Sequence, residues 1–164
     1  MPVYSDLERL ATWETLLRLV DSLLRRFERE LQTEVDLPLT WYDVLVQLYR
    51  APDHQLRMQT LAELVVLSRS GLTRLVDRLE SAGLVRREPC REDRRGYYAI
   101  LTEKGLGVYE EARIIHRRGV REHFVQHLTD EDIEALYTVV RKVRGDEATE
   151  RDLAMFLQRK PQEV

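Results

Sequence analysis

The sequence predicts a mainly α-helical fold with one small β-hairpin. Apolar residues recur three and four positions apart over most of the 164 residues, which is the period of an amphipathic helix. Proline, glycine and small polar residues interrupt this pattern at the positions expected for helix ends. Two short runs with strand composition, residues 84–87 and 97–101, flank a polar segment that contains Pro89 and Gly96. Helices therefore account for most of the chain, and a hairpin lies near its middle.

The first predicted helix covers residues 5–34. One apolar stripe follows the helical period, and a second stripe lies beside it. The first consists of Leu10, Trp13, Leu17, Val20, Leu24, Phe27 and Leu31, and the second of Leu16, Leu19 and Leu23. A helix that is apolar over so wide an arc has to be covered on more than one side. We expect its own domain to cover one side and a partner subunit to cover the other.

A second helix is predicted after the break at Leu37-Pro38. Thr40 is the expected N-cap residue, and Asp43 lies near the positive end of the helix dipole. The helix is expected to stop at Ala51-Pro52.

Two short helices are predicted next. Thr60 is expected to cap the first of them, with Glu63 in the capping-box position, and Ser68 is expected to cap the second, which ends at Ala82-Gly83. Their apolar faces are Leu61, Leu64 and Val65 in the first helix, and Leu72, Leu75, Val76 and Leu79 in the second. Because only about three residues separate the two helices, they have to cross steeply, as in a helix-turn-helix.

The hairpin follows this pair directly, and its tip, residues 88–96, is long and charged. A helix-turn-helix followed by a charged hairpin is a winged helix. After it, Thr102 and Glu103 are expected to start a long helix that runs to Leu128. A further helix starts at Thr129, with acidic residues in its first turn, and is stopped by Gly145.

Positive charge is concentrated on the second short helix and the hairpin. The whole chain has a net charge of -3, but residues 68–95 contain eight basic and five acidic residues, which leaves +3 on this segment and -6 on the rest. The basic residues are Arg69, Arg74, Arg78, Arg86, Arg87, Arg91, Arg94 and Arg95. A nucleic-acid-binding protein needs only a local basic surface, so this asymmetry indicates a DNA-binding face.

Two groups of residues are candidates for DNA contact. The N-terminal half of a recognition helix reaches base edges in the major groove, where arginine reads guanine and Ser or Thr contact bases or phosphate. The candidates on this helix are Ser68, Arg69, Ser70, Thr73 and Arg74. An arginine at the hairpin tip can enter a narrow minor groove, and a neighbouring aspartate can orient it. The candidates on the hairpin are Arg91, Asp93, Arg94 and Arg95. Each residue, taken singly, also fits a solvated surface.

Residues 39–105 resemble the multiple-antibiotic-resistance regulator (MarR) family. The similarity lies in the combined spacing of five short motifs. These are Leu61-Ala-Glu-Leu64, Ser68-Arg-Ser-Gly-Leu-Thr-Arg-Leu-Val-Asp-Arg-Leu79, Gly83-Leu-Val-Arg-Arg87, Asp93-Arg-Arg-Gly96 and Leu101-Thr-Glu-Lys-Gly105. The long helices on either side agree with the family's plan.

The resemblance implies a homodimer that binds a pseudo-palindromic operator in double-stranded DNA and acts as a transcriptional regulator, with Arg95 in the minor groove. It implies three parts: a dimerisation helix (1–35), a winged-helix lobe (39–103) and C-terminal dimerisation helices (104–160). It also implies a ligand-responsive repressor that releases DNA when a small aromatic or anionic effector binds between the dimerisation helices and the lobe. Candidate residues of that cleft are Trp13, Leu17, Trp41, Tyr49 and Tyr109, although aromatic residues at helical spacing also suit a core.

Four other residues, one cysteine and three histidines, have side chains that can react or bind metals. Cys90 lies near arginines, which favour thiol oxidation, and it also fits an incidental position in the hairpin. His123 and His127 are spaced for metal binding from one helix face, with His116 seven residues before His123. Histidines on a polar or dimer-facing helix surface give the same pattern, and we expect neither a metal nor a cofactor.

Other function classes have little support in the sequence. We find no nucleophile elbow, no phosphate-binding glycine loop and no paired catalytic carboxylates, so we expect no enzyme. One cysteine, no signal peptide and no long apolar run predict a cytoplasmic protein that is not bound to membranes. The alternative to DNA binding is a winged-helix module that binds other proteins.

Overall fold

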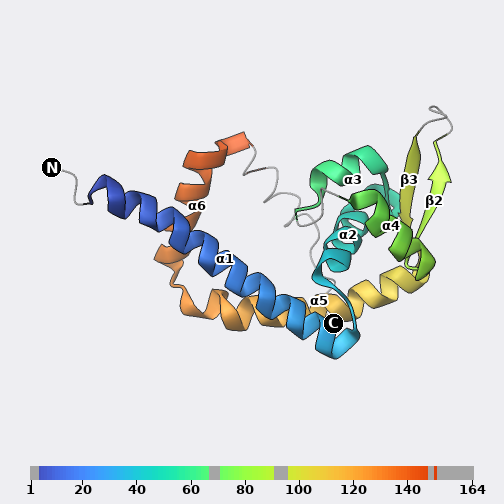
Figure 1. The fold of residues 1–164 in the computed structure, drawn as a ribbon, viewed down its shortest axis with the longest axis horizontal. Helices are drawn as coiled ribbons and strands as arrows, with labels where there is room; N and C mark the ends of the chain where they lie inside the picture. The colour runs from blue at the N-terminus through green and yellow to red at the C-terminus, as the bar shows by residue number, and fades with distance from the viewer. Residues whose placement is uncertain (1–3, 67–70, 91–95, 148–149, 151–164) are drawn as a thin grey trace. The chain divides into compact units, whose positions relative to one another are not determined.

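The computed structural model describes residues 4–66, 71–90, 96–147 and 150 (Figure 1). The chain divides into two compact units, Met1–His123 and Phe124–Val164. The described residues of the first unit form five α-helices, a 3-10 turn and a three-stranded sheet, and those of the second include a short 3-10 turn followed by an α-helix. This confirms the mainly helical fold class with a small β-hairpin.

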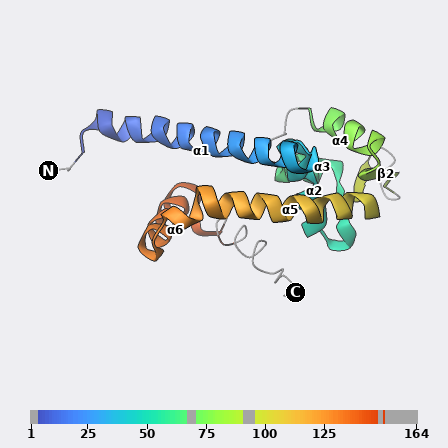
Figure 2. The same ribbon diagram turned by 90° about the horizontal axis from the view of Figure 1, so that it is seen from below.

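Helices α1 (Asp6–Val35) and α5 (Glu103–His123) pack against each other within the first unit (Figure 2). The start of α1 agrees with the prediction, because Ser5 and Glu8 form a reciprocal capping box. The two helices approach closely at Gly119, where a Cβ atom would overlap the carboxylate of Glu30 and press on the ring of Phe27. The absence of a side chain at Gly119 therefore allows this part of the α1–α5 contact.

Helix α2 (Leu39–Arg50) is mostly buried. The sequence predicted its C-terminal end correctly but not its N-terminal cap. It stops before Ala51, as expected, but Thr40 is not its cap. The N-cap residue is Pro38, and the carboxylate of Glu28 on α1 accepts the amide of Leu39 at 2.7 Å. A group from another helix thus satisfies the amide that a local cap would have bound.

A short strand that the sequence did not predict, β1 (Gln55–Arg57), follows α2 after a 3-10 turn, η1 (Pro52–His54). It leads directly into α3 (Met58–Leu64), whose N-cap residue is Arg57. The prediction that Thr60 caps this helix is wrong, because the chain leaves the strand and enters the helix three residues earlier.

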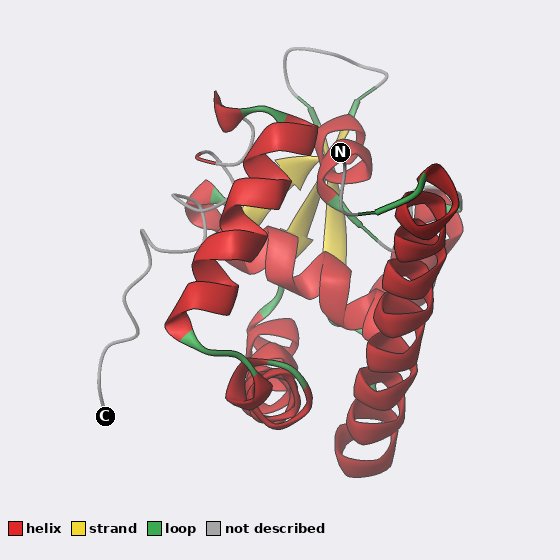
Figure 3. Cartoon of the chain, turned by 90° about the vertical axis from the view of Figure 1, so that its left-hand side faces the viewer, coloured by secondary structure: helices red, strands yellow, loops and turns green. Residues whose placement is uncertain are grey.

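The sheet is antiparallel, with strand order β1-β3-β2, and Figure 3 shows the strands beside the helices. Strands β2 (Val85–Pro89) and β3 (Tyr97–Leu101) form the predicted hairpin, with Val85 paired to Leu101. Strand β1 pairs with the other edge of β3, Gln55 opposite Ile100. The hairpin is therefore attached to the rest of the lobe through β1.

Helix α5 begins against the start of the hairpin. The hydroxyl of Thr102 donates to the carbonyl of Gly83 at 2.7 Å and accepts the amide of Gly105 at 2.9 Å. A Cβ atom on Gly105 would overlap the carbonyl oxygen of Leu84, so only glycine allows this approach. The Leu101–Gly105 motif thus joins the hairpin to α5.

Helix α5 is shorter than predicted. It ends at His123 instead of continuing to Leu128, and a 3-10 turn, η2 (Val125–His127), follows the non-helical backbone of Phe124. In the second unit, α6 (Asp130–Arg144) agrees with the prediction at both ends. Thr129 caps it in a capping box with Asp132, and Gly145 ends it.

Aromatic rings fill the junction of α1, α2 and α5. The ring centroids of Tyr49 and Tyr109 are 4.2 Å apart, and Tyr42 also stacks with Tyr109, at 6.0 Å. His116 lies 4.7 Å from the Tyr42 ring and 5.2 Å from the Phe27 ring. Burial raises the pKa of both Tyr42 and Tyr109, so these two phenols remain neutral near pH 7. These five residues form the aromatic cluster that joins the three helices.

Within the part of the chain that the structure describes, no helix combines the length and the apolar character needed to cross a membrane.

The position of His116 predicts a loss of stability in acid. Burial lowers the pKa of His116 below its ordinary value, so the unfolded chain binds this proton more readily than the folded one. The free energy of unfolding should therefore fall as the pH drops below about 6.5, the pKa of an unperturbed histidine. Replacing His116 with Phe should reduce the difference in Tm between pH 8 and pH 5.5. Replacing the exposed His127 with Gln should leave that difference unchanged, and an equal effect of both variants would contradict the assignment.

Candidate nucleic-acid interface

The helix-turn-helix consists of α3 and α4 (Leu72–Ser81), and α4 separates apolar from polar residues. Leu72, Val76 and Leu79 are buried, as predicted. Thr73 and Arg74 are exposed, and so is Arg78 one turn later. Neither arginine forms an ion pair with another described residue, so both charges face solvent. This is the arrangement of a recognition helix with a buried base and a polar, basic outer face.

The N-terminus of α4 differs from the prediction. The described helix begins at Leu72, and its N-cap residue is Gly71, with a left-handed backbone (φ 90°) and no side-chain cap. Ser68, the predicted cap, lies outside the described residues. The same holds for two other predicted major-groove residues, Arg69 and Ser70, and for all four predicted hairpin-tip residues, Arg91, Asp93, Arg94 and Arg95. Their DNA contacts stay predictions.

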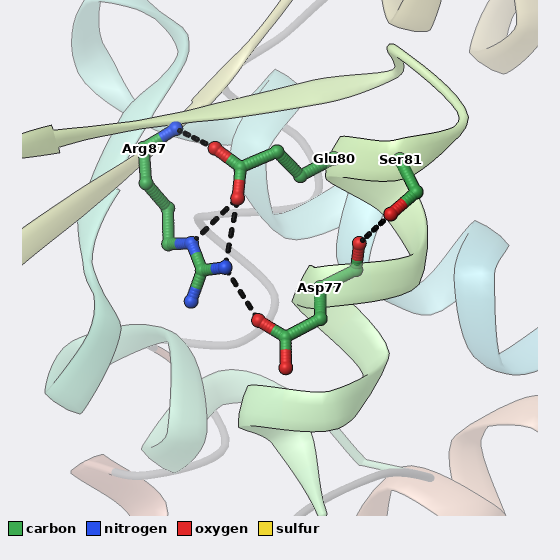
Figure 4. Close-up of polar contacts among 4 residues, drawn as sticks. All are labelled: Asp77, Glu80, Ser81 and Arg87. Carbon is green, nitrogen blue, oxygen red and sulfur yellow. Dashed lines mark hydrogen bonds and ion pairs between the residues drawn. The ribbon is translucent and has the colours of Figure 1, made fainter.

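Arg87 on β2 binds two acidic residues of α4 (Figure 4). Its Nε donates to Glu80 Oε2 at 2.9 Å, and its backbone amide donates to Glu80 Oε1 at 3.0 Å. A terminal nitrogen of its guanidinium pairs with both Glu80 and Asp77. We call these three residues the α4–β2 clamp. It fixes the first strand of the hairpin against the recognition helix with several charge-assisted hydrogen bonds.

The clamp favours the charged forms of Glu80 and Arg87. Hydrogen bonds from the side chain and the backbone of Arg87 lower the pKa of Glu80 below its usual value. Hydrogen bonds to Glu80, opposed by partial burial and supported by a bond to Asp77, raise the pKa of Arg87. At neutral pH the clamp therefore consists of one cation and two anions.

The clamp reduces the number of arginines that are available to bind a ligand. The sequence count included Arg86 and Arg87 in the basic surface, but Arg87 is bound within the clamp and Arg86 pairs with Glu88. Both pairings lie within the segment, and together they contain two cations and three anions. The rest of residues 68–95 then has six basic and two acidic residues, a net charge of +4. Sequence reasoning missed the clamp because spacing alone does not show which acids face β2.

The predicted effector residues fall into two groups. Tyr49 and Tyr109 stack within the aromatic cluster, and Trp41 is half-buried against the core. Trp13 and Leu17 are exposed on the N-terminal half of α1, with 61% and 48% of their surfaces accessible. A groove lies between α1 and α2, and two of its lining residues, Leu39 and Thr40, directly precede Trp41 in the sequence. It is lined by Leu24, Arg25, Glu28, Arg29, Leu39 and Thr40.

The structure shows what surrounds Cys90 and the three histidines that the sequence analysis considered. Cys90 is buried, with 3% of its surface accessible, and its amide donates to the carbonyl of Gly96 at 2.9 Å. His116 belongs to the aromatic cluster, His123 pairs with Glu30 on α1, and His127 is exposed in η2. Among the described residues, no three side chains of His, Cys, Asp or Glu come together as a metal site.

These features define a winged helix-turn-helix protein: α3 and α4 form the helix pair, and β2 and β3 form the wing. A model of the MarR family matches residues 35–96. Sco3205 of Streptomyces coelicolor, a MarR family transcriptional regulator solved in complex with DNA, is 34% identical, with a TM-score of 0.79. The match covers 88% of this chain and 90% of that one. AbsC, a MarR family transcriptional regulator of the same organism, is 35% identical over 88% of this chain and 96% of its own, with a TM-score of 0.77.

The chain belongs to the MarR family of transcriptional regulators. A mutant of MarR from E. coli, solved with operator DNA, has the same fold at 24% identity. That match covers 85% of this chain and 99% of the other, with a TM-score of 0.73.

The clamp predicts unequal effects for two neighbouring arginines. Arg87→Ala leaves Asp77 and Glu80 without their cation and should lower the free energy of unfolding by about 1 kcal/mol, since the partners are partly exposed. Arg86→Ala, the matched control, should change it by less than about 0.5 kcal/mol. Arg87→Lys should recover only part of the loss, because a single ammonium group cannot replace the two guanidinium nitrogens that bind Glu80 and Asp77. Urea unfolding measures all three, and equal losses at positions 86 and 87 would contradict the clamp.

Proposed function

We propose that this protein is a sequence-specific regulator that binds double-stranded DNA as a homodimer at a pseudo-palindromic operator and acts as a repressor. The outer face of α4 carries the proposal, because it presents Thr73, Arg74 and Arg78 while the acids Asp77 and Glu80 are both paired with Arg87. Phosphate and base edges would meet hydroxyl and guanidinium groups there. The DNA complexes of Sco3205 and E. coli MarR support the same use of this fold.

The proposed contacts divide between two grooves. Thr73 and Arg74, with Ser68, Arg69 and Ser70 before them, would lie at the major groove, where their side chains read bases. Arg91, Arg94 and Arg95 would lie along the backbone and the minor groove next to the wing, with Asp93 orienting Arg95. The clamp supports this assignment, because it sets the position of the wing relative to α4.

The basic surface predicts binding that is specific and sensitive to salt. A duplex from upstream of the protein's own gene should bind in preference to random duplex, and affinity should fall steeply as salt rises. Arg74→Ala and Arg95→Ala should each weaken operator binding at least tenfold and reduce its preference over random duplex, because both arginines are assigned to the grooves. Arg121→Ala, on the exposed side of α5, is the control and should bind normally.

A fluorescence titration at two salt concentrations, with random duplex as competitor, measures these effects. Normal operator binding by Arg95→Ala would show that the wing assignment is wrong. Weak, equal binding of the wild-type protein to every duplex tested would favour the protein-interaction module instead.

Homodimerisation is supported by the apolar residues that α1 leaves uncovered. The N-terminal half of this helix exposes between 44% and 77% of each of seven large apolar side chains. They are Leu7, Leu10, Trp13, Leu16, Leu17, Leu19 and Val20. In the second unit, α6 likewise exposes Leu136, Tyr137, Val139, Val140 and Val143. Monomeric proteins rarely expose continuous apolar surfaces of this kind, and a second copy of the chain would cover them.

The dimer should depend on the apolar face of α1. The wild-type protein should sediment at about twice the chain mass of 19.4 kDa. Leu17→Glu places a charge in the proposed interface and should shift the protein towards monomers, since an unpaired buried charge is costly. Glu14→Gln, on the same helix, should remain dimeric. Sedimentation equilibrium distinguishes these outcomes, and a wild-type monomer at micromolar concentration would contradict the proposal.

A small aromatic or anionic effector is also part of the proposed function. Two features support it: the stacked rings of Tyr49 and Tyr109, and the groove between α1 and α2, whose lining includes Arg25 and Arg29. Such a molecule would have to bind more tightly to the geometry that cannot hold DNA, because equal affinity for both geometries shifts nothing.

A further inference from the structure

A buried carboxylate on α2 contacts the turn between the two helices of the helix-turn-helix. Asp43 is 9% exposed and lies on the most buried helix of the protein. Its Oδ2 accepts the backbone amide of Val66 at 2.8 Å, and the side-chain nitrogen Nε2 of Gln47 lies 3.5 Å from its Oδ1. Burying a carboxylate is costly unless hydrogen bonds compensate for the lost water. The bond to Val66 provides such compensation.

The contact falls where α3 ends and the turn begins. The amide of Val65 still bonds to the carbonyl of Leu61 in α3, and the Val65 side chain is buried with 1% accessible. The next residue, Val66, has a side chain that is 79% exposed and gives it little hydrophobic anchoring. The bond from its amide to Asp43 is therefore a main attachment of the start of the turn to the core.

We infer that Asp43 is a positioning residue that fixes the start of the α3–α4 turn and thereby the presentation of α4 to DNA. The inference rests on the proposed function. The Val66 amide is neutral, so this bond requires an acceptor oxygen and not a negative charge. Asparagine can provide that oxygen, whereas leucine, of similar size, cannot.

This role differs from the one that the sequence indicated, namely a favourable charge near the positive end of the helix. A helix-dipole role would require the charge itself and would not survive replacement by asparagine. A general role in core stability would be shared by any residue buried in α2. The two alternatives are therefore separated by the asparagine variant and by a second core variant in the same helix.

The experiment compares wild-type protein with Asp43→Asn, Asp43→Leu and Asp43→Ala, and uses Val44→Ala as the control. Val44 is fully buried in the same helix, and its truncation lowers stability without removing an acceptor from the turn. Two quantities are measured well below every Tm: the affinity for the upstream duplex, and the hydrogen-exchange rate of the Val66 amide. The alanine variant keeps the test informative if the leucine variant does not fold.

We expect Asp43→Asn to bind DNA within about threefold of wild type. Asp43→Leu and Asp43→Ala should bind about tenfold or more weakly, and their Val66 amides should exchange at least tenfold faster, since a lost hydrogen bond leaves this donor unpaired. Val44→Ala should change neither quantity by as much, despite its lower Tm. Loss of binding in Asp43→Asn equal to that in Asp43→Leu would overturn the inference, as would losses no larger than those of Val44→Ala.

The outcome separates this inference from the proposed function. If wild-type protein binds the duplex and Asp43→Leu and Asp43→Ala bind equally well, the inference is wrong and the function stands. If wild-type protein binds no duplex, the proposed function is wrong. In that case the exchange rate of the Val66 amide alone tests whether Asp43 holds the start of the turn. An unchanged rate in Asp43→Leu and Asp43→Ala would overturn the inference too.

Discussion

The burial of α2 is the constraint on which the rest of the first unit depends. Eight of its twelve residues are buried, so neighbouring elements have to cover it on nearly every side. Helices α1 and α5, helix α3 and strand β3 all contact it. A helix enclosed in this way allows few polar side chains, and those it contains have to be hydrogen-bonded. This explains why Asp43 and the first amide of the helix both bond to groups outside α2, Val66 and Glu28.

Charged side chains are also paired on the side of the lobe that carries the outer face of α4. The protein is acidic overall, and α4 itself contributes Asp77 and Glu80 next to its arginines. Left unpaired, these two carboxylates would repel phosphate. The clamp joins them to Arg87 and uses the same contact to hold the wing. Arg87 therefore both holds the wing and pairs the two carboxylates. A count of charges along the sequence predicts neither effect.

Sequence patterns predicted the features that depend on local interactions and missed those that depend on distant partners. The apolar period placed α1 and α4, and the capping residue Thr129 and Gly145 placed α6. Thr40 and Thr60 were wrong as caps because Glu28 of α1 and the β1–β3 pairing determine where those helices begin. Strand β1 has only three residues and exists through its pairing with β3, so it leaves no pattern of its own. Of the candidate DNA contacts, Thr73 and Arg74 have the predicted exposure, whereas the importance of Asp43 and the clamp follows only from tertiary structure.

The contacts around α4 also bear on how a regulator of this fold can change state. The turn before α4 is attached to α2 through Asp43, and the far half of α4 is attached to the wing through Glu80 and Arg87. Tilting α4 away from the wing would break the hydrogen bonds between Glu80 and Arg87, which join charged groups. In the proposed homodimer, moving a whole lobe relative to its counterpart would break none of them. Because packed units change position more readily than they deform, these contacts favour rigid displacement of the lobes in the proposed response to an effector, with α4 and the wing moving as one body.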